Sequence, residues 1–286
     1  MIVVCGATGR IGGTAARALR ARGLAVKAVV RDAAKSAPLV EQGCTLAVAD
    51  LADAFSLTKA FRDATAVLVI CPVPPSEVVV EKARRVIDGV GAALEAVAPA
   101  VVVAISDYGA HVPDGTGITL ILRSLEGRLR GLRAATTFLR SAEHMQNWLR
   151  QLAVVRATGV LPSLHHPITR PFPTVSAFDV GRVAAEILAA PAAALAGPRT
   201  IHVEGPRRYA AADVAAVFAR RLGRDVTAHA VDRAEWAAAL AKAGIGGSFA
   251  RLVIELQDAH NRGLVEIEPG GTVHRASTEL ADALGG

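Results

Sequence analysis

Short β-branched segments alternate with longer segments of helical period along the first half of the chain. The short segments are apolar without strict alternation, which is typical of parallel strands covered by helices on both faces. They predict strands over residues 2–5, 25–30, 45–48, 66–70, 101–105 and 135–139. The segments between them predict helices over residues 11–22, 33–42, 52–62, 76–97 and 118–131. This β–α–β order predicts an α/β protein with a Rossmann-type, doubly wound parallel sheet.

The pattern becomes less regular after residue 140. A helix is predicted over residues 142–158, followed by an irregular Pro- and His-rich loop over 161–173. Later segments predict helices over 179–189, 211–222, 233–243 and 249–260, strands over 200–203 and 226–231, and an irregular tail. We therefore predict a Rossmann domain over residues 1–158 and a smaller mixed α/β substrate lobe over 159–286, with some segments of the lobe returning to the first sheet.

A glycine-rich turn joins the first predicted strand to the first predicted helix, with the sequence Gly6-Ala-Thr-Gly-Arg-Ile-Gly12. Gly6 permits the tight turn, Gly9 leaves room where the backbone approaches a pyrophosphate, and Gly12 lets the helix pack closely on the sheet. The N-terminus of the helix offers free N–H groups to the anion. The turn therefore predicts a dinucleotide site formed by Gly6, Thr8, Gly9, Arg10, Ile11 and Gly12.

The residue that ends the second strand indicates which dinucleotide binds. NAD-binding domains carry an acid here that holds the ribose hydroxyls, whereas Arg31 can bind a 2′-phosphate bidentately. The sequence therefore favours NADP(H), and the neighbouring Asp32 leaves NAD(H) open. The alternative for Arg31 is a solvated side chain at the end of a strand.

Further candidates for cofactor contact follow the third, fourth and fifth strands. Ligands of open α/β sheets bind at the carboxyl ends of the strands, and several residues fall at those ends. Asp50 could equally cap the next helix. The candidates are Asp50, Leu51, Cys71, Pro72 and Ser106.

Composition excludes several other classes of protein. The formal charge of +6 is dispersed at helical spacings without interleaved aromatic residues, so we expect a solvated basic surface and no nucleic-acid partner. Cys5, Cys44 and Cys71 are widely separated, which disfavours zinc and disulfides, and the pair His165-His166 lacks the spacing of a closed metal site. No signal peptide or membrane-spanning run is visible, so we expect a cytoplasmic protein without a membrane partner.

The chain resembles the NmrA-like branch of the atypical short-chain dehydrogenases/reductases, which includes NADPH-dependent quinone oxidoreductases. The resemblance implies a Rossmann domain, a small C-terminal substrate lobe and bound NADP(H), in proteins that either reduce a substrate or sense the cofactor ratio without turnover. It covers most of the chain and rests on Gly6-Ala-Thr-Gly-Arg-Ile-Gly12, Val30-Arg31-Asp32, Ala49-Asp50-Leu51, Ile105-Ser106, Glu126, Phe138-Leu-Arg140, Met145-Gln-Asn147, Asp179-Val-Gly181 and the segment 205–222.

The chain departs from this group at the positions that would carry proton transfer. Ordinary short-chain dehydrogenases have a Tyr-x-x-x-Lys pair, but Tyr108 is followed four residues later by Val112. Related reductases place a Lys or His one helical turn before the acid matched by Glu126, where this chain has Leu122. Tyr108 and His111, in the loop after the fifth strand, are therefore the candidate catalytic residues, with simple solvation as the alternative for both.

Candidates for substrate contact lie further along the chain. His144 and Trp148 would share one face of the predicted helix 142–158, although a tryptophan is more often a core residue. The full set is His144, Asn147, Trp148 and Phe172. Together these features predict an NAD(P)H-dependent oxidoreductase that passes hydride to a quinone-like or other conjugated small-molecule acceptor. The alternative is a non-catalytic NADP(H) sensor that docks a protein partner, and the sequence leaves a monomer or a homodimer open.

Overall fold

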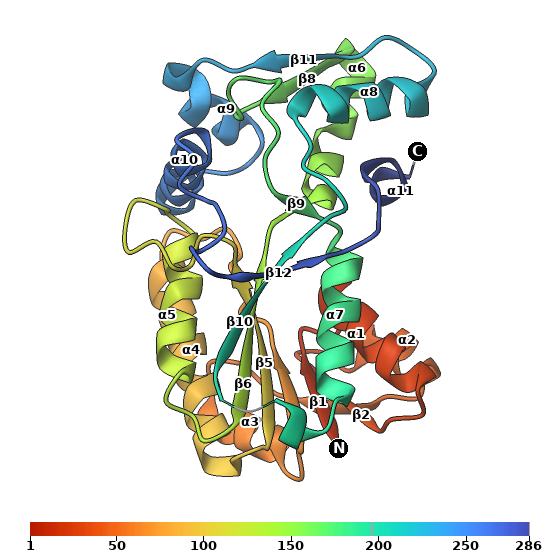
Figure 1. Cartoon of the computed structure of the whole chain (residues 1–286), viewed down its shortest axis with the longest axis vertical. Helices are drawn as coiled ribbons and strands as arrows, with labels where there is room; N and C mark the ends of the chain where they lie inside the picture. The colour runs from red at the N-terminus through yellow and green to blue at the C-terminus, as the bar shows by residue number, and fades with distance from the viewer. Residues whose placement is uncertain (196, 286) are drawn as a thin grey trace.

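Eight parallel strands form the main sheet of the computed structural model, which describes residues 1–195 and 197–285 (Figure 1). Across the sheet the order is β12-β10-β6-β5-β4-β1-β2-β3. The strands are β1 (Ile2–Cys5), β2 (Val26–Val30), β3 (Thr45–Val48), β4 (Ala66–Val69), β5 (Val101–Asp107), β6 (Ala135–Ser141), β10 (Arg199–Glu204) and β12 (Thr272–Arg275). The chain reverses its direction of travel across the sheet between β1 and β4, which is the switch point of a Rossmann fold. The predicted fold class is confirmed.

Helices cover both faces of this sheet (Figure 1). On one face α1 (Arg10–Ala21) and α7 (Ala177–Ala189) pack against each other and on Ile2 and Val4. On the other face α3 (Ala54–Phe61), α4 (Val79–Val97) and α5 (Thr119–Leu129) pack on Val3 and Cys5. Successive residues of β1 thus enter opposite cores, which explains why the strand is apolar throughout. The short α2 (Ala37–Glu41) follows a 3-10 turn, η1 (Ala34–Ser36).

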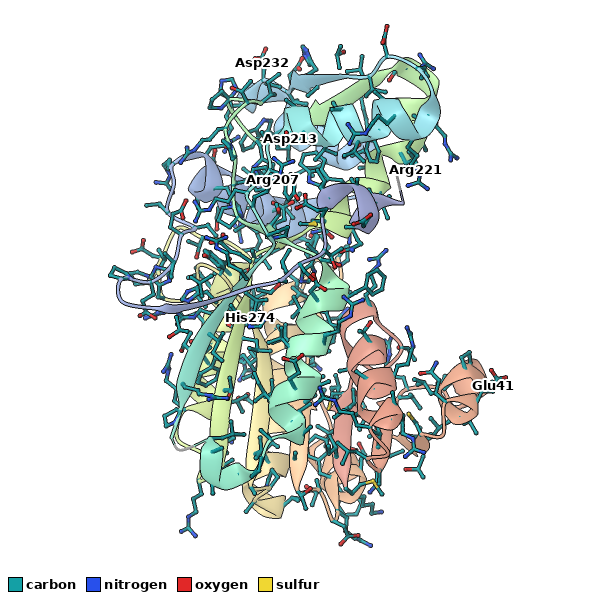
Figure 2. All side chains as sticks on the ribbon, turned by 45° about the vertical axis from the view of Figure 1, so that its right-hand side comes forward. Glu41, Arg207, Asp213, Arg221, Asp232 and His274 are labelled. Carbon is teal, nitrogen blue, oxygen red and sulfur yellow. The ribbon has the colours of Figure 1, made fainter. Side chains whose placement is uncertain are left out.

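A smaller lobe lies beyond the carboxyl ends of the strands (Figure 1). Its core contains Met145, Trp148, Phe172, Tyr209 and Phe218. Arg207, Asp213 and Arg221 lie on this lobe, whereas His274 of β12 lies beside the main sheet (Figure 2). The elements of the smaller lobe are η2 (Met145–Gln151), α6 (Leu152–Thr158), β8 (Val160–Ser163), α8 (Ala211–Leu222), β11 (Thr227–Ala230), η4 (Arg233–Glu235), α9 (Trp236–Lys242) and α11 (Leu280–Leu284). Strand β8 pairs in parallel with β11.

A two-stranded sheet and one helix connect the lobe with the main sheet. The short strands β7 (Glu143–His144) and β9 (Thr174–Val175) pair in parallel directly after β6. Helix α10 (Gly247–Asn261) places Phe249 and Leu252 in the core that α4 and α5 form with the sheet. A 3-10 turn, η3 (Ala192–Ala194), follows α7. None of the helices in residues 1–195 and 197–285 combines the length and apolarity that crossing a membrane requires.

The structure corrects three sequence predictions. The predicted helix 142–158 is β7 followed by η2, and only its last turns are α-helical, because the Gln146 side chain bonds both Ser176 and the backbone N–H of Ala177. The predicted loop 161–173 begins inside β8. The predicted irregular tail contains α11 and also β12, which pairs with β10 in the main sheet. In each case a tertiary partner overrides the local pattern.

Segments on both sides of residue 158 contribute to each unit. Elements η2 and α6 pack in the smaller lobe, whereas α7, β10 and β12 lie in the main layers. The division into residues 1–158 and 159–286 stays a proposal about how the chain is organised.

Candidate functional site

The glycine turn brings β1 and α1 into direct contact. Gly6 has φ +67°, a left-handed conformation that disfavours other residues, and its carbonyl accepts a hydrogen bond from the Gly9 N–H at 2.9 Å. A Cβ on Gly12 would lie 2.3 Å from the Gly6 carbonyl oxygen, so any side chain there would push the helix away from the turn. Ile11 is buried, whereas Thr8, Gly9 and Arg10 are exposed.

The first turn of α1 is open to an anion. Its N-cap is Gly9, and no side chain caps the N–H groups that follow. Uncapped N–H groups and the helix dipole together favour a bound phosphate. The structure therefore provides the geometry that a pyrophosphate requires at this turn.

The other predicted cofactor residues line the same edge of the sheet. Because the strands are parallel and ordered β5-β4-β1-β2-β3, their carboxyl ends follow one another along this edge. Arg31 and Pro72 are exposed, Leu51 is half-buried, and burial raises the pKa of the Cys71 thiol to about 12. Along the edge the residues come in the order Ser106, Cys71–Pro72, the glycine turn, Arg31 and Asp50–Leu51.

Asp50 does not cap α3. Its carboxylate accepts a hydrogen bond from the Ala52 N–H at 2.9 Å, within the loop that follows β3. Asp53 is the N-cap of α3 and accepts from the Phe55 N–H at 3.0 Å. The alternative role considered for Asp50 is therefore wrong, and its exposed carboxylate stays at the sheet edge.

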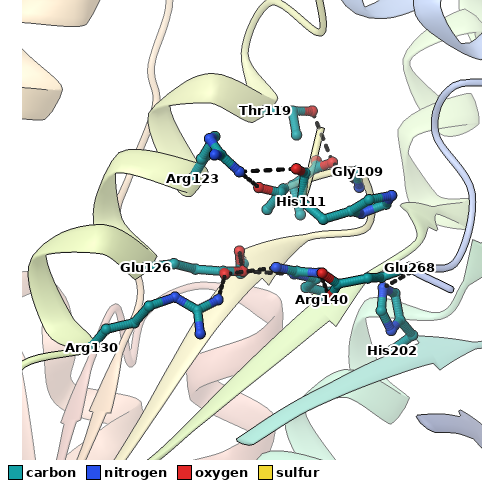
Figure 3. A network of polar contacts seen from close by, with 12 residues as sticks. Gly109, His111, Thr119, Arg123, Glu126, Arg130, Arg140, His202 and Glu268 are labelled. Carbon is teal, nitrogen blue, oxygen red and sulfur yellow. Dashed lines mark hydrogen bonds and ion pairs between the residues drawn. The ribbon is translucent and has the colours of Figure 1, made fainter. Parts of the chain in front are cut away.

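Ser106 bonds to a polar network that joins Glu126, Arg140 and Glu268. Figure 3 shows these last three residues. The Ser106 hydroxyl donates to Glu126 at 2.7 Å, and Arg140 donates to both oxygens of Glu126 at 2.8 Å. A third nitrogen of Arg140 lies 2.7 Å from Glu268. Burial alone would raise the pKa of Glu126, but the bonds from Arg140 and Ser106 lower it below its ordinary value. The Ser106 hydroxyl is thus engaged with Glu126.

Tyr108 and His111 lie beside this network. Tyr108 is 1% exposed and donates its hydroxyl to Glu204, and burial together with Glu204 raises the pKa of Tyr108. The ring of His111 lies beside Arg140, 6.3 Å from the ring of His202 (Figure 3). Burial and Arg140 lower the pKa of His111, so its neutral form dominates near pH 7. Neither group is poised to release a proton.

The predicted substrate residues lie next to β7 and η2. His144 Nε2 is 2.9 Å from the Ser141 hydroxyl, and burial lowers the pKa of His144 to about 4, with Arg10 of the glycine turn adding to the effect. Because His144 belongs to β7, it shares no helix face with Trp148, contrary to the prediction. Trp148 and Phe172 are buried with ring centroids 6.5 Å apart, and Asn147 is half-buried.

Sequence reasoning missed a polar cluster around Glu143. The Glu143 carboxylate lies 3.0 Å from His165 Nε2, and His165 Nδ1 lies 2.8 Å from the Gln257 side-chain nitrogen. From sequence, His165 is a candidate only for metal binding. Within the described part of the chain, no three His, Cys, Asp or Glu side chains are placed to hold a metal ion. The available signal was the position of Glu143, directly after a strand that ends at the predicted cofactor edge.

Comparison with known proteins supports the predicted resemblance. Residues 1–111 match the NmrA-like family. The match covers the glycine turn, Arg31, Asp50 and Ile105-Ser106, whereas the positions of the resemblance from Glu126 onward lie outside it.

Similar proteins extend the likeness over most of the chain. The NAD(P)H azoreductase of Xenophilus azovorans is 28% identical over 257 residues, which cover 90% of this chain and 86% of the azoreductase. The structure of an NADPH-dependent quinone oxidoreductase from Escherichia coli, complexed with NADPH, has a TM-score of 0.80 at 22% identity. The matched region covers 100% of this chain and 99% of the oxidoreductase chain. The structure of the triphenylmethane reductase of Citrobacter sp., complexed with NADP(H), has a TM-score of 0.79 at 19% identity. The matched region covers 99% of this chain and 98% of the reductase chain. The two structures establish a shared fold.

The glycine turn also contacts α7 closely. A Cβ on Gly181 would lie 2.6 Å from the Ile11 carbonyl oxygen, so α7 and α1 can pack only with glycine there. Asp179, at the start of α7, accepts hydrogen bonds from the N–H and hydroxyl of Thr278 at 3.1 and 2.9 Å. These contacts fix the first turn of α1 and the C-terminal segment relative to α7.

The structure has two shallow surface hollows. One is lined by residues that include Glu77, Val80 and Arg251, and the other by residues that include Phe55 and Lys59. Neither contains a predicted site residue.

Proposed function

We propose that this chain is an NAD(P)H-dependent oxidoreductase that passes a hydride to a quinone-like or other conjugated small-molecule acceptor. The observation that carries the proposal is the uncapped first turn of α1 at the switch point, with Arg31 at the end of the adjacent strand. The azoreductase that is similar over 90% of this chain supports an acceptor of conjugated type.

The residues at the sheet edge fit a nicotinamide dinucleotide. The backbone of Thr8, Gly9 and Arg10 would hold the pyrophosphate, because these exposed residues surround the uncapped N–H groups. Arg31 would bind the 2′-phosphate of NADP(H), and Asp50 would face the adenosine half. When bound, the cofactor supplies the hydride, and the chain orients it and limits access of water.

Tyr108 and His111 support this activity by holding neighbouring elements in place. The Tyr108 hydroxyl is bonded to Glu204, which also accepts from Arg208 at 3.2 Å and from Arg275 at 2.9 Å. These bonds tie β5 to β10 and the C-terminal segment, and the ring of His111 lies 6.3 Å from that of His202 on β10. Both residues are therefore proposed as positioning residues.

Turnover tests the proposal directly. Purified protein mixed with NADPH and a panel of small quinones and azo compounds is expected to consume NADPH, followed as loss of nicotinamide absorbance. Tight binding of NADPH without oxidation by any acceptor would instead favour a non-catalytic NADP(H) sensor, which the absence of a Tyr-x-x-x-Lys pair also suits. Absence of binding to either pyridine nucleotide would exclude both functions.

Arg31→Asp tests the choice of cofactor. The substitution removes a guanidinium from the 2′-phosphate and places a carboxylate near it, so NADPH should bind about 10- to 100-fold more weakly, as for the loss of a charge-assisted hydrogen bond. NADH, which lacks that phosphate, should bind with little change. Calorimetric titration measures both affinities. Arg62→Asp, at the exposed C-terminal end of α3, is the matched control, and equal losses for both cofactors would contradict the role of Arg31.

A further inference from the structure

Glu143 stands on the acceptor side of the expected cofactor position. The order of the strands places Arg31 on one side of β1 and the ends of β4, β5 and β6 on the other. A dinucleotide whose 2′-phosphate contacts Arg31 and whose pyrophosphate contacts the glycine turn therefore directs its nicotinamide toward β4 and β5. Glu143 follows β6, one strand further along, and contacts His165 of the smaller lobe. An acceptor that stands against the nicotinamide there would lie close to Glu143.

Hydrogen bonds fix Glu143 as a carboxylate beside a neutral imidazole. The Gln257 side-chain nitrogen, which can only donate, lies 2.8 Å from His165 Nδ1, so Nδ1 is the acceptor of a neutral ring. The proton of that ring is then on Nε2, which lies 3.0 Å from one oxygen of Glu143 and donates to it. Burial would raise the pKa of Glu143, but the neighbouring imidazoles, His165 first, lower it. Glu143 therefore carries a negative charge near pH 7.

This charge has no cationic partner in the described part of the chain. Within ion-pair distance of Glu143 lies only the neutral ring of His165. Burial lowers the pKa of His144 and of His260 to about 4, so these two imidazoles are neutral near pH 7 as well. Burial raises the pKa of Asp107 at the end of β5, and the charge of Glu143 adds to this effect. A largely buried carboxylate is costly without a counter-charge, so the position favours a bound cation.

Three arginines face the two outer imidazoles instead. Arg10 belongs to the glycine turn, where the cofactor phosphates would neutralise it, and Arg170 donates to a backbone carbonyl at 2.7 Å. In residues 1–195 and 197–285 neither reaches ion-pair distance of Glu143. The contacts are those of Arg10 and Arg150 with His144 and of Arg170 with His260.

The surroundings of Glu143 suit an organic cation better than a metal ion. The ring of His165 stacks on Phe172 with centroids 3.6 Å apart, and the ring of Trp148 lies 5.8 Å from that of His165. These rings keep water from the inner side of the carboxylate, which strengthens its attraction for a cation. No three His, Cys, Asp or Glu side chains of the described residues are placed to hold a metal ion. The second oxygen of Glu143 has no hydrogen-bond partner among those residues, and 22% of the side chain is exposed, so a molecule can reach it.

We propose that Glu143 selects a flat, delocalised organic cation as the hydride acceptor, with its open oxygen against the positive charge. The proposal rests on the proposed oxidoreductase function. Hydride transfer forms a C–H bond at the electron-poor carbon of the cation and breaks a C–H bond of the reduced cofactor. Both electrons of the broken bond move with the hydrogen, so the acceptor becomes neutral and no proton is consumed. The neutral product no longer pairs with Glu143, which favours its release.

A cationic acceptor also suits the proton chemistry of the site. Tyr108 is bonded to Glu204 with a raised pKa, the ring of His111 is neutral near pH 7, and Glu143 is ionised. None of these groups is poised to release a proton. A quinone or azo acceptor needs a proton after hydride transfer and would have to take it from solvent, whereas a cationic triarylmethane dye needs none.

The test measures binding of a cationic triarylmethane dye to the protein saturated with NADP⁺, followed by the absorbance of the dye. Glu143→Gln keeps the size of the side chain and removes its charge, so the dye should bind about 10- to 100-fold more weakly, as for the loss of a charged hydrogen-bond partner. Glu143→Asp keeps the charge and should retain most of the affinity. In turnover with NADPH, Glu143→Gln should raise KM for the dye by a similar factor and leave KM for a neutral quinone nearly unchanged.

Controls make each failure recognisable. Glu186→Gln removes a carboxylate from an exposed position on α7 and is the matched control, and calorimetric NADPH titration checks that each variant is folded. If the wild type oxidises NADPH with no acceptor, the proposed function fails and this assignment fails with it.

Three results with an active wild type would overturn the role of Glu143 alone. The first is a wild type that reduces quinones and does not bind the dye. The second is a Glu143→Gln variant that binds the dye as the wild type does, or loses dye and quinone equally. The third is a Glu143→Gln variant that weakens NADP⁺ relative to NADPH and leaves the dye unchanged, because the carboxylate would then serve the oxidised nicotinamide.

Discussion

Arg140→Ala should lower the free energy of unfolding by about 3–5 kcal/mol, the cost of breaking a buried ion pair from one side. The side chains of Arg140 and Glu126 are each 2% exposed, and the substitution removes two hydrogen bonds at 2.8 Å from Glu126. The Glu126 carboxylate would remain buried with Ser106 and the half-exposed Arg130 as its partners. Denaturant titration measures the loss from the midpoint at an unchanged slope.

An exposed pair provides the comparison for Arg140. Arg128 lies 2.6 Å from Glu95, whose side chain is 56% exposed, so Arg128→Ala should cost no more than about 1 kcal/mol. The double variant Arg140→Met with Glu126→Gln should lose less stability than the sum of the single variants, because each single variant leaves a buried charge without its main partner and the double variant removes both charges. Similar small losses for Arg140→Ala and Arg128→Ala would contradict the importance assigned to the network.

Acid should destabilise the protein well above the range in which carboxylates titrate. Burial lowers the pKa of His144, His202 and His260 to about 4 from an ordinary value of 6.5. Between these two values the unfolded chain binds protons at these rings and the folded protein does not. Stability is therefore unaffected by these groups above pH 6.5 and falls as the pH decreases from 6.5 towards 4.

The size of the acid effect follows from the number of histidines. Each neutral histidine contributes a slope of about 1.4 kcal/mol per pH unit, and His202, which is fully buried, accounts for about 3 kcal/mol by pH 4. His144 and His260 are partly exposed, so their contributions are smaller. Glu126, whose pKa is lowered in the folded protein, reduces the stability only when the pH falls below the ordinary glutamate pKa of 4.5.

Denaturant titrations at several pH values from about 7.5 to about 4.5 measure how the free energy of unfolding changes with pH. His202→Gln keeps a polar side chain beside the Glu268 N–H and removes the titrating ring, so its slope should be shallower than that of the wild type. A stability that stays constant from pH 6.5 to 4.5 would show that these rings are protonated in the folded protein.

Local sequence patterns predicted the first half of the fold closely. The strands at Ile2–Cys5 and Thr45–Val48 have the predicted bounds, and the helix at Arg10–Ala21 differs by one residue at each end. These elements depend on features that neighbouring residues carry: continuous apolar runs for strands buried on both faces, helical periodicity, and glycines at a tight turn. The dinucleotide edge is predictable for the same reason, since the candidates lie at or near the carboxyl ends of strands.

Contacts between distant residues decided the rest. The partner of Glu143 is 22 residues away, that of His165 is 92 residues away on α10, and Arg140 reaches Glu268 across 128 residues. The same kind of contact turned the predicted helix 142–158 into β7 and η2 and drew the tail into the sheet as β12. No local pattern encodes such partners, because they depend on how the elements pack.

The sequence by itself therefore determined the Rossmann architecture, the glycine turn and the position of Arg31, because each is a property of a strand and the residues next to it. Tertiary structure alone decided that Tyr108 and Ser106 are bonded to Glu204 and Glu126, and that Glu143 and His165 meet beside the cofactor edge. A hydroxyl or carboxylate has the same chemistry wherever it stands in a sequence, and only the folded neighbours determine whether it holds a structure together or remains open to a substrate.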